Sequence, residues 1–173
     1  EEGKLQKKYL ALAEGDLSEA NDSVFWKEIA IPLAPDPENP MKMTISPDGL
    51  LPGSRNAVTY YKNIKSFGNV TLVELQLETG RTHQIRVHMS GIGHPLLGDT
   101  MYNPRVCLKM SNSKEKKNTE GRINNRNDCF KRAALHAWKL TFCHPFTDEI
   151  ITLEAPLPDD FCRFLNANEE EKT

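Results

Sequence analysis

The alternation of side chains in residues 70–78 is the feature that most constrains the fold. Three aliphatic residues alternate there with three polar ones, namely Val73, Leu75 and Leu77 with Glu74, Gln76 and Glu78. This period-two pattern is typical of a strand that buries one face. Residues 57–62 are also rich in aromatic and β-branched types, and the sequence NIKSFGN separates the two segments. We therefore expect an antiparallel hairpin.

Further segments complete the expected architecture. A short strand at residues 9–13 precedes a region with six of the eleven prolines, which predicts a long loop with at most short edge strands because proline lacks an N–H donor. A second hairpin, residues 140–143 and 150–154, flanks the turn sequence HPFTDE. The stretch APLPDDFCRFL predicts a capped terminal helix that buries Phe161, Phe164 and Leu165. The expected fold class is α+β, with a largely antiparallel mixed sheet flanked by helices and loops.

The size and composition fit one globular domain. The chain has 173 residues, 38% of them hydrophobic and 27% charged. We assign residues 1–165 to this domain and residues 166–173 to a frayed acidic tail. No apolar run approaches the ~20 residues of a membrane span, so we expect no membrane partner and a cytoplasmic location, or an organelle if the source is eukaryotic. The chain begins without Met and with a strand-like pattern almost at once, so we expect that a longer protein contains it.

Cysteine spacing indicates no metal ribbon and no redox dithiol. No C-x-x-C pair occurs among the four cysteines, which are Cys107, Cys129, Cys143 and Cys162. We expect them to be reduced and mostly buried.

Charge is unevenly distributed along the chain. Residues 103–132 carry nine basic and three acidic side chains, a local charge of +6, so the remainder must carry −8 to give the net charge of −2. A basic segment on an acidic body can reach a phosphate backbone. The candidates for such contacts are Lys109, Lys114, Lys116, Lys117, Arg122 and Arg126. The alternative is a solvated loop.

The sequence ETGRTHQIRVHMSGIGHPLLGD, residues 78–99, predicts a helix that follows a strand directly. Ile85, Met89 and Ile92 have helical spacing, which places a helix at about residues 83–92. Thr82 is the expected N-cap and Gly93 the expected residue after the helix.

The histidines of this segment are poor metal ligands. His83 and His88 are five residues apart, about 140° around a helix, and they would face opposite ways on a strand. His94 precedes a proline and is expected in a turn or in packing. We expect no metal site.

Arginine at the helix start predicts an anion site instead. Arg86 lies in the first turn, where free N–H groups already favour negative charge, and Arg81 lies close to the same end. The occupant would be a phosphate or a carboxylate. The alternative is an arginine that pairs with a structural Asp or Glu.

Four segments, in order, resemble the RluA family of RNA pseudouridine synthases. They are KKYLALAEG, AVTYYK, ETGRTHQIRVHMSGIGHPLLGDTMY and ALHAWKLTFCHPFTDEIITLEAPLPDDF. Asp148 and Asn103 stand where the family usually or often has Gly, and both types tolerate a left-handed backbone. The basic run at residues 103–132 is longer than the resemblance requires and is interpreted as an insertion. The family's H-R-L-D segment, which carries the catalytic Asp, does not occur in these 173 residues.

The resemblance implies an activity and roles for particular residues. The activity is isomerisation of uridine to pseudouridine in structured RNA, either ribosomal or transfer RNA, with no cofactor and by a chain expected to be a monomer. Arg86 would pair with the catalytic Asp, and Tyr9 would pack against the uracil ring. Arg81, Thr82, His83 and Gln84 are assigned to substrate contact or to the scaffold of the site. The part of the domain that this chain supplies would be inactive alone, because the Asp lies outside it.

Two other functions fit parts of the pattern. The first is an RNA-binding domain that keeps the cleft and performs no chemistry, which an absent H-R-L-D segment in the gene would indicate. The second is a metal-dependent hydrolase that uses the histidines, which loss of activity to a chelator would indicate.

Overall fold

The strands of the computed structural model form one six-stranded sheet and one small ribbon. The structure describes residues 5–17, 25–105 and 130–169. The large sheet has the order β2-β5-β6-β1-β7-β8, and all its pairings are antiparallel. Its strands are β1 (Gln6–Glu14), β2 (Lys27–Ile29), β5 (Thr59–Ser66), β6 (Val70–Leu77), β7 (Leu135–Cys143) and β8 (Ile150–Glu154). The ribbon pairs β3 (Leu33–Pro35) with β4 (Met43–Ile45).

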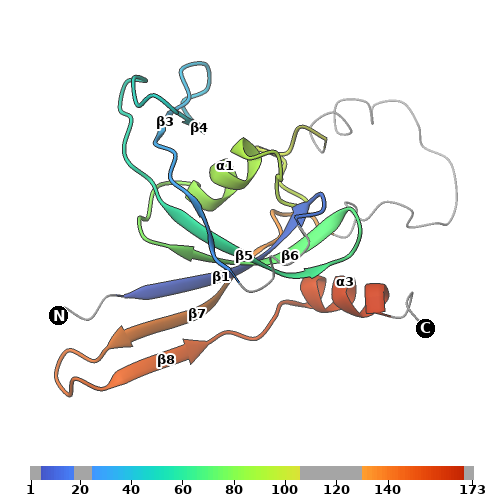
Figure 1. Ribbon diagram of the computed structural model, residues 1–173. Helices are drawn as coiled ribbons and strands as arrows, with labels where there is room; N and C mark the ends of the chain where they lie inside the picture. The colour runs from blue at the N-terminus through green and yellow to red at the C-terminus, as the bar shows by residue number, and fades with distance from the viewer. Residues whose placement is uncertain (1–4, 18–24, 106–129, 170–173) are drawn as a thin grey trace, which may run out of the picture.

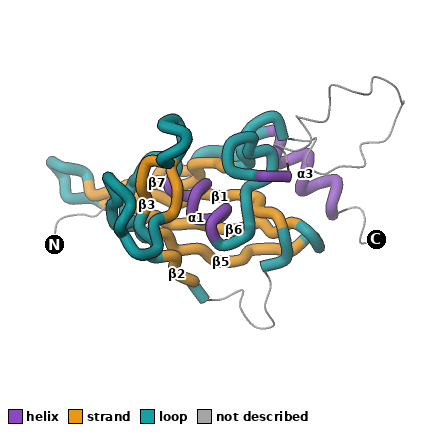
Figure 2. Tube along the Cα trace, turned by 90° about the horizontal axis from the view of Figure 1, so that it is seen from above, coloured by secondary structure: helices purple, strands orange, loops and turns teal. Residues whose placement is uncertain are grey.

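Two helices lie on opposite sides of the large sheet, α1 (Gln84–Gly91) above it and α3 (Asp159–Glu169) below it in the view of Figure 1. The expected α+β class is therefore confirmed. Both predicted hairpins are present as β5–β6 and β7–β8, and the described residues between β1 and β5 form only the three-residue strands β2, β3 and β4. Seen from above, α1 crosses the middle of the sheet between β3 and the central strands (Figure 2).

Strand alternation on β1 and β6 divides the interior into two cores. Ala11 pairs with Val73 on the α1 side, where Ile85 and Met89 of the helix join them in one cluster. On the other side, Leu12 pairs with Leu72 in a cluster that contains Phe161 and Phe164 of α3. The helical spacing of Ile85, Met89 and Ile92 was thus a correct guide to the packed face of α1.

The α3 side of the sheet departs from the expected pattern at Glu74. Its side chain is 6% exposed, and it bonds Lys8 at 2.9 Å and Lys62 at 2.8 Å. The prediction that this strand, β6, buries only one face is therefore wrong. A carboxylate can be buried there because two ammonium groups from neighbouring strands neutralise it.

The C-terminal helix is longer than expected. Phe161 and Phe164 are 0% and 2% exposed, as predicted, and both pack edge-on or tilted against Phe130. The tail expected to fray from residue 166 is helical up to Glu169. Most of the predicted basic insertion, together with Cys107 and Cys129, lies outside the described residues. Within the described parts of the chain, no helix is long and apolar enough to cross a membrane.

Candidate active site

The turn between β6 and α1 is held by Gln84. This side chain is buried, and its oxygen accepts hydrogen bonds from the Thr79 hydroxyl (2.8 Å) and the Arg81 backbone N–H (2.9 Å). Its amide nitrogen donates to the Val58 carbonyl oxygen (2.9 Å) and to Thr59 Oγ1 (3.0 Å). Gln84 therefore uses all its polar groups to position the helix start and belongs to the scaffold of the site.

The prediction that Thr82 caps the helix is wrong. The N-cap is His83, whose backbone is left-handed at φ 54°, and no side chain caps the first turn. Thr82 itself is exposed. The left-handed residue redirects the chain sharply into α1, and the bonds of Gln84 hold that turn in place of a threonine cap. At the other end Gly93 has φ 87°, as expected for the residue after a helix.

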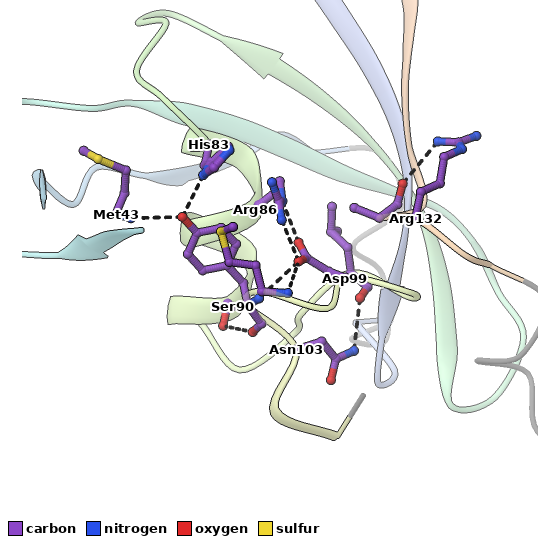
Figure 3. A network of polar contacts seen from close by, with 11 residues as sticks. Met43, His83, Arg86, Ser90, Asp99, Asn103 and Arg132 are labelled. Atoms are coloured by element: carbon purple, nitrogen blue, oxygen red, sulfur yellow. Dashed lines mark hydrogen bonds and ion pairs between the residues drawn. The ribbon is translucent and has the colours of Figure 1, made fainter. Parts of the chain in front are cut away.

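Arg86, which is half-buried, forms an ion pair with the buried Asp99. Its Nε donates to Asp99 Oδ2 at 2.7 Å and its Nη2 to Asp99 Oδ1 at 2.8 Å, which is a bidentate side-on geometry. The Asp99 side chain is 0% exposed and that of Arg86 is 21% exposed. Figure 3 shows the pair between α1 and the loop that follows it. The alternative of a structural acidic partner for Arg86 is therefore realised, and the partner comes from the same sequence segment.

Asp99 stays ionised because of its hydrogen bonds. Burial alone would raise the pKa of Asp99, but the bonds from Arg86 and from the backbone N–H groups of Met101 and Tyr102 outweigh burial and lower it. The pKa of Arg86 is raised, chiefly by its bond to Asp99. Both members of the pair are therefore charged at neutral pH, and the pair as a whole is neutral.

The aromatic ring of Tyr102 packs against the face of the Arg86 guanidinium. The Arg86 Cζ atom lies 4.8 Å from the centre of the Tyr102 ring, a cation–π distance. The Tyr102 hydroxyl oxygen accepts from the Met43 backbone N–H at 2.9 Å and lies 2.8 Å from His83 Nδ1, and these contacts are drawn in Figure 3. Burial, reinforced by Arg86, lowers the pKa of His83, so this histidine is a neutral hydrogen-bonding group at neutral pH.

One edge of the Arg86 guanidinium remains available. The side-on bonds to Asp99 use Nε and one N–H of Nη2, and within the described residues Nη1 has no hydrogen-bond partner. The N–H groups of the end-on edge, formed by Nη1 and Nη2, can therefore donate hydrogen bonds to a second anion. A carboxylate or a phosphate matches this fork geometry.

Tyr9 lies on the sheet face that α1 covers. It pairs with Leu75 in the β1–β6 register and packs, half-buried, against the cluster that contains Ile85. Its hydroxyl has no partner in the part of the chain that the structure describes. Tyr9 and the helix that carries Arg86 thus lie on the same side of the sheet, and the shared site that the resemblance implies for them stays a prediction.

Of the other candidate residues, the structure describes Arg81 but not the six basic residues between positions 109 and 126. Arg81 donates from Nε to the Asn56 carbonyl oxygen at 3.1 Å beside the helix start. Lys109, Lys114, Lys116, Lys117, Arg122 and Arg126 lie outside the described residues.

The histidines are engaged in structural contacts. His88 is fully buried between Thr59 Oγ1 and the Ile31 carbonyl oxygen, each at 2.8 Å, and His94 Nδ1 lies 2.8 Å from the Glu14 carbonyl oxygen. His136 Nε2 lies 3.3 Å from the Ala155 carbonyl oxygen. Among the described residues no group of three His, Cys, Asp or Glu side chains is arranged to hold a metal ion.

Asp99 and Tyr102 are site residues that the sequence analysis did not single out. Both lie in GHPLLGDTMY, residues 93–102. The only local signal was their spacing, because an Asp can accept bonds from the N–H groups two and three residues later. Their contacts with Arg86 connect positions 13 and 16 residues apart, which no periodicity predicts.

Comparisons with known proteins identify the family of the chain. Residues 1–91, which include Tyr9 and Arg86, match the family model described as RNA pseudouridylate synthase. An uncharacterized RNA pseudouridine synthase of Bacillus subtilis is 38% identical over 159 residues, which are 92% of this chain and 43% of that protein. Ribosomal large subunit pseudouridine synthase D of Haemophilus influenzae is 39% identical over 164 residues, 95% of this chain and 45% of that protein.

Solved structures show the same similarity. Human RNA Pseudouridylate Synthase Domain Containing 4 superposes with a TM-score of 0.67 at 26% identity, covering 95% of this chain and 62% of that chain. Human RNA Pseudouridylate Synthase Domain Containing 1 gives a TM-score of 0.62 at 27% identity over 89% of this chain and 55% of that chain. The present chain spans less than half the length of the two bacterial relatives.

Proposed function

The chain belongs to the RNA pseudouridylate synthase family, and from this premise we propose that the protein isomerises uridine to pseudouridine in RNA. In this reaction the C1′–N1 glycosidic bond breaks, the uracil turns, and C5 bonds to C1′. The C5 proton is lost and N1 gains one, so the composition of the RNA does not change. The uridine must leave its stack to be reached, which costs a few kcal/mol and is cheapest in loops.

The proposal rests on the guanidinium of Arg86, which is fixed by Asp99 but still has N–H groups without a partner among the described residues. A bidentate bond to the buried Asp99 fixes it, and its end-on edge stays available on the side of the sheet where Tyr9 lies. An aspartate from the H-R-L-D segment would bind this edge and would be kept ionised there, as a nucleophile or a base must be. Tyr9 offers a flat apolar face to the uracil, and a hydroxyl that has no partner among the described residues.

Ribosomal RNA is the first substrate class to test. The relative from Haemophilus influenzae is named for the large ribosomal subunit, and transfer RNA is the second class. The monomeric state and the cytoplasmic location stay predictions from the sequence. Light scattering after size-exclusion chromatography tests the first, and microscopy of the tagged full-length gene product tests the second.

The decisive experiment compares Arg86 variants of the full-length gene product. Arg86→Ala should reduce pseudouridine formation at least about 100-fold, while Arg86→Lys keeps the charge but loses the fork and should retain only part of the activity. The readout is pseudouridine mapping in RNA from cells that lack the gene and carry each variant, with circular dichroism to show that each variant is folded. Near-normal pseudouridine formation by Arg86→Ala would refute the role of Arg86.

The same experiment tests the alternative of an RNA-binding domain without chemistry. This alternative predicts that RNA sites are unchanged when the gene is deleted, although the purified protein binds RNA. Loss of defined pseudouridine sites on deletion, and their recovery with the wild-type gene, would exclude it.

A further inference from the structure

The loop after α1 is anchored by a buried carboxylate, that of Asp99. Asp99 is 1% exposed and accepts four hydrogen bonds, two from Arg86 and two from the backbone N–H groups of Met101 and Tyr102. Both backbone bonds end on Oδ1 and hold that oxygen independently of Arg86, and burial restricts the rest of the carboxylate. The orientation of the carboxylate therefore determines where the guanidinium lies, since the two groups meet in a planar fork.

Tyr102 restricts the remaining freedom of the guanidinium. Its ring lies under Arg86, and the ring is held by contacts of its hydroxyl with Met43 and His83 and by a bond from Ser90 Oγ to its own carbonyl oxygen at 2.8 Å. A free arginine carries about 2 kcal/mol of side-chain rotamer entropy. Contacts from one edge and one face remove most of that freedom before any ligand binds.

The charges point to a role in orientation rather than in attraction. Asp99 cancels the charge of Arg86, and His83 beside them is neutral, so an incoming anion meets directed N–H groups more than a net positive field. A site meant only to attract RNA would leave Arg86 unpaired. Pairing with Asp99 weakens the electrostatic attraction of Arg86 for RNA but fixes the orientation of its end-on N–H groups. A reacting carboxylate needs such a fixed orientation.

We infer that Asp99 and Tyr102 are positioning residues that aim the end-on edge of Arg86 at the catalytic carboxylate. This inference rests on the proposed function. Neither residue needs to touch the RNA or the reacting atoms. A purely structural role would instead make both residues contribute to stability alone.

The test uses the full-length gene product with Asp99→Asn, which keeps the size of the side chain and removes its charge. The turnover number should fall about 100-fold, because misplacement by about 1 Å can cost this much. The KM for RNA should stay the same or fall, because the released Arg86 adds a positive charge. Tyr102→Phe, which keeps the ring, should lose less turnover than Tyr102→Leu, which removes it.

Asn103→Ala is the matched control. Asn103 is 0% exposed and holds the same loop through bonds to Glu14 Oε1 (2.8 Å) and to the Leu96 carbonyl oxygen (3.0 Å), and no bond joins it to Arg86. This variant should lose stability but keep its turnover number when assayed well below its melting temperature. If Asp99→Asn keeps near-normal turnover, or if Asn103→Ala loses turnover to the same extent, the positioning role is wrong.

A second measurement is independent of turnover. In NMR spectra of the full-length protein, the Arg86 Nε–H signal should be sharp and slow to exchange in the wild type and in Asn103→Ala, and broad or fast to exchange in Asp99→Asn. A protected signal in Asp99→Asn would overturn the inference. Absence of pseudouridine formation by the wild type would instead overturn the proposed function, so the two failures are distinguishable.

Discussion

Glu74 is the residue whose environment gives the clearest dependence of stability on pH. Burial would raise the pKa of Glu74, but bonds from Lys62 and Lys8 outweigh burial and lower it. A carboxyl group with a lowered folded-state pKa stabilises the fold above its unfolded-state value of about 4.3. That contribution is lost as the pH falls through the folded-state pKa.

Replacing Glu74 by Gln should therefore reduce stability at neutral pH and matter less in acid. We expect a loss of about 1–3 kcal/mol at about pH 7, because two half-buried ammonium groups lose their partner. The difference from the wild type should shrink below about pH 4. Urea unfolding of the full-length protein at several pH values measures both effects.

The control for Glu74 is an exposed ion pair on the same sheet. Lys139 pairs with Glu154 at the β7–β8 edge, where the Glu154 side chain is 54% exposed. Glu154→Gln should change stability by less than about 1 kcal/mol. A loss as large as that of Glu74→Gln would show that the burial of Glu74 is not the cause.

Sequence reasoning at the scale of residues succeeded where the determinant was local. Asp148 was expected to tolerate a left-handed turn, and it has φ 54°. Asn103 is not left-handed but buried, since its amide bonds Glu14 from a strand 89 positions away. Glu74 and Asp99 were missed for the same reason, because burying a carboxylate requires cationic partners that only the tertiary fold supplies.

At the scale of elements, Gly98 controls the fit between the loop after α1 and the segment that precedes β7. Its φ is +66°, and a Cβ there would lie 2.7 Å from the Phe130 carbonyl oxygen and would also meet the Arg132 carbonyl oxygen. Gly98→Ala should cost more than about 2 kcal/mol, from backbone strain and from a contact with backbone atoms that cannot move cheaply. Because Asp99 follows directly, pseudouridine formation should fall as well.

Gly49→Ala is the control that separates the cost of backbone strain from the cost of steric crowding at Gly98. Gly49 also has a positive φ, +71°, but a Cβ there would meet nothing within 4 Å. This variant should lose only about 1 kcal/mol. Thermal unfolding of the full-length protein measures both variants, and equal losses would contradict the crowding at Gly98.

The elements themselves were largely predictable because their signals are periodic. The alternation in β6 and the aromatic spacing in α3 each predicted an element that is present, although β6 is buried on both faces from Val70 to Leu75. The start of α1 was not predictable, since the cap depends on a left-handed His83 stabilised by side-chain bonds of Gln84 to Val58 and Thr59, which lie some 25 residues away.

At the scale of the whole molecule, the uneven charge predicts how RNA binding depends on salt. Residues 103–132 carry +6 on a chain whose net charge is −2. If the basic side chains contact phosphates, each contact releases counterions and adds about 0.7–0.9 to the slope of log affinity against log salt. Replacing six of them by Gln, at Lys109, Lys114, Lys116, Lys117, Arg122 and Arg126, should reduce that slope by up to about 4–5.

The experiment measures affinity for one RNA between low and physiological salt, using the full-length protein and fluorescence anisotropy. Substitution preserves the length of the segment, so it isolates charge, and a deletion of residues 109–126 then shows whether length adds anything. Arg86→Ala is the comparison for a single cation, which should change the slope by no more than about 1. An unchanged slope in the six-residue variant would mean that the segment is a solvated loop and that RNA is held elsewhere on the protein.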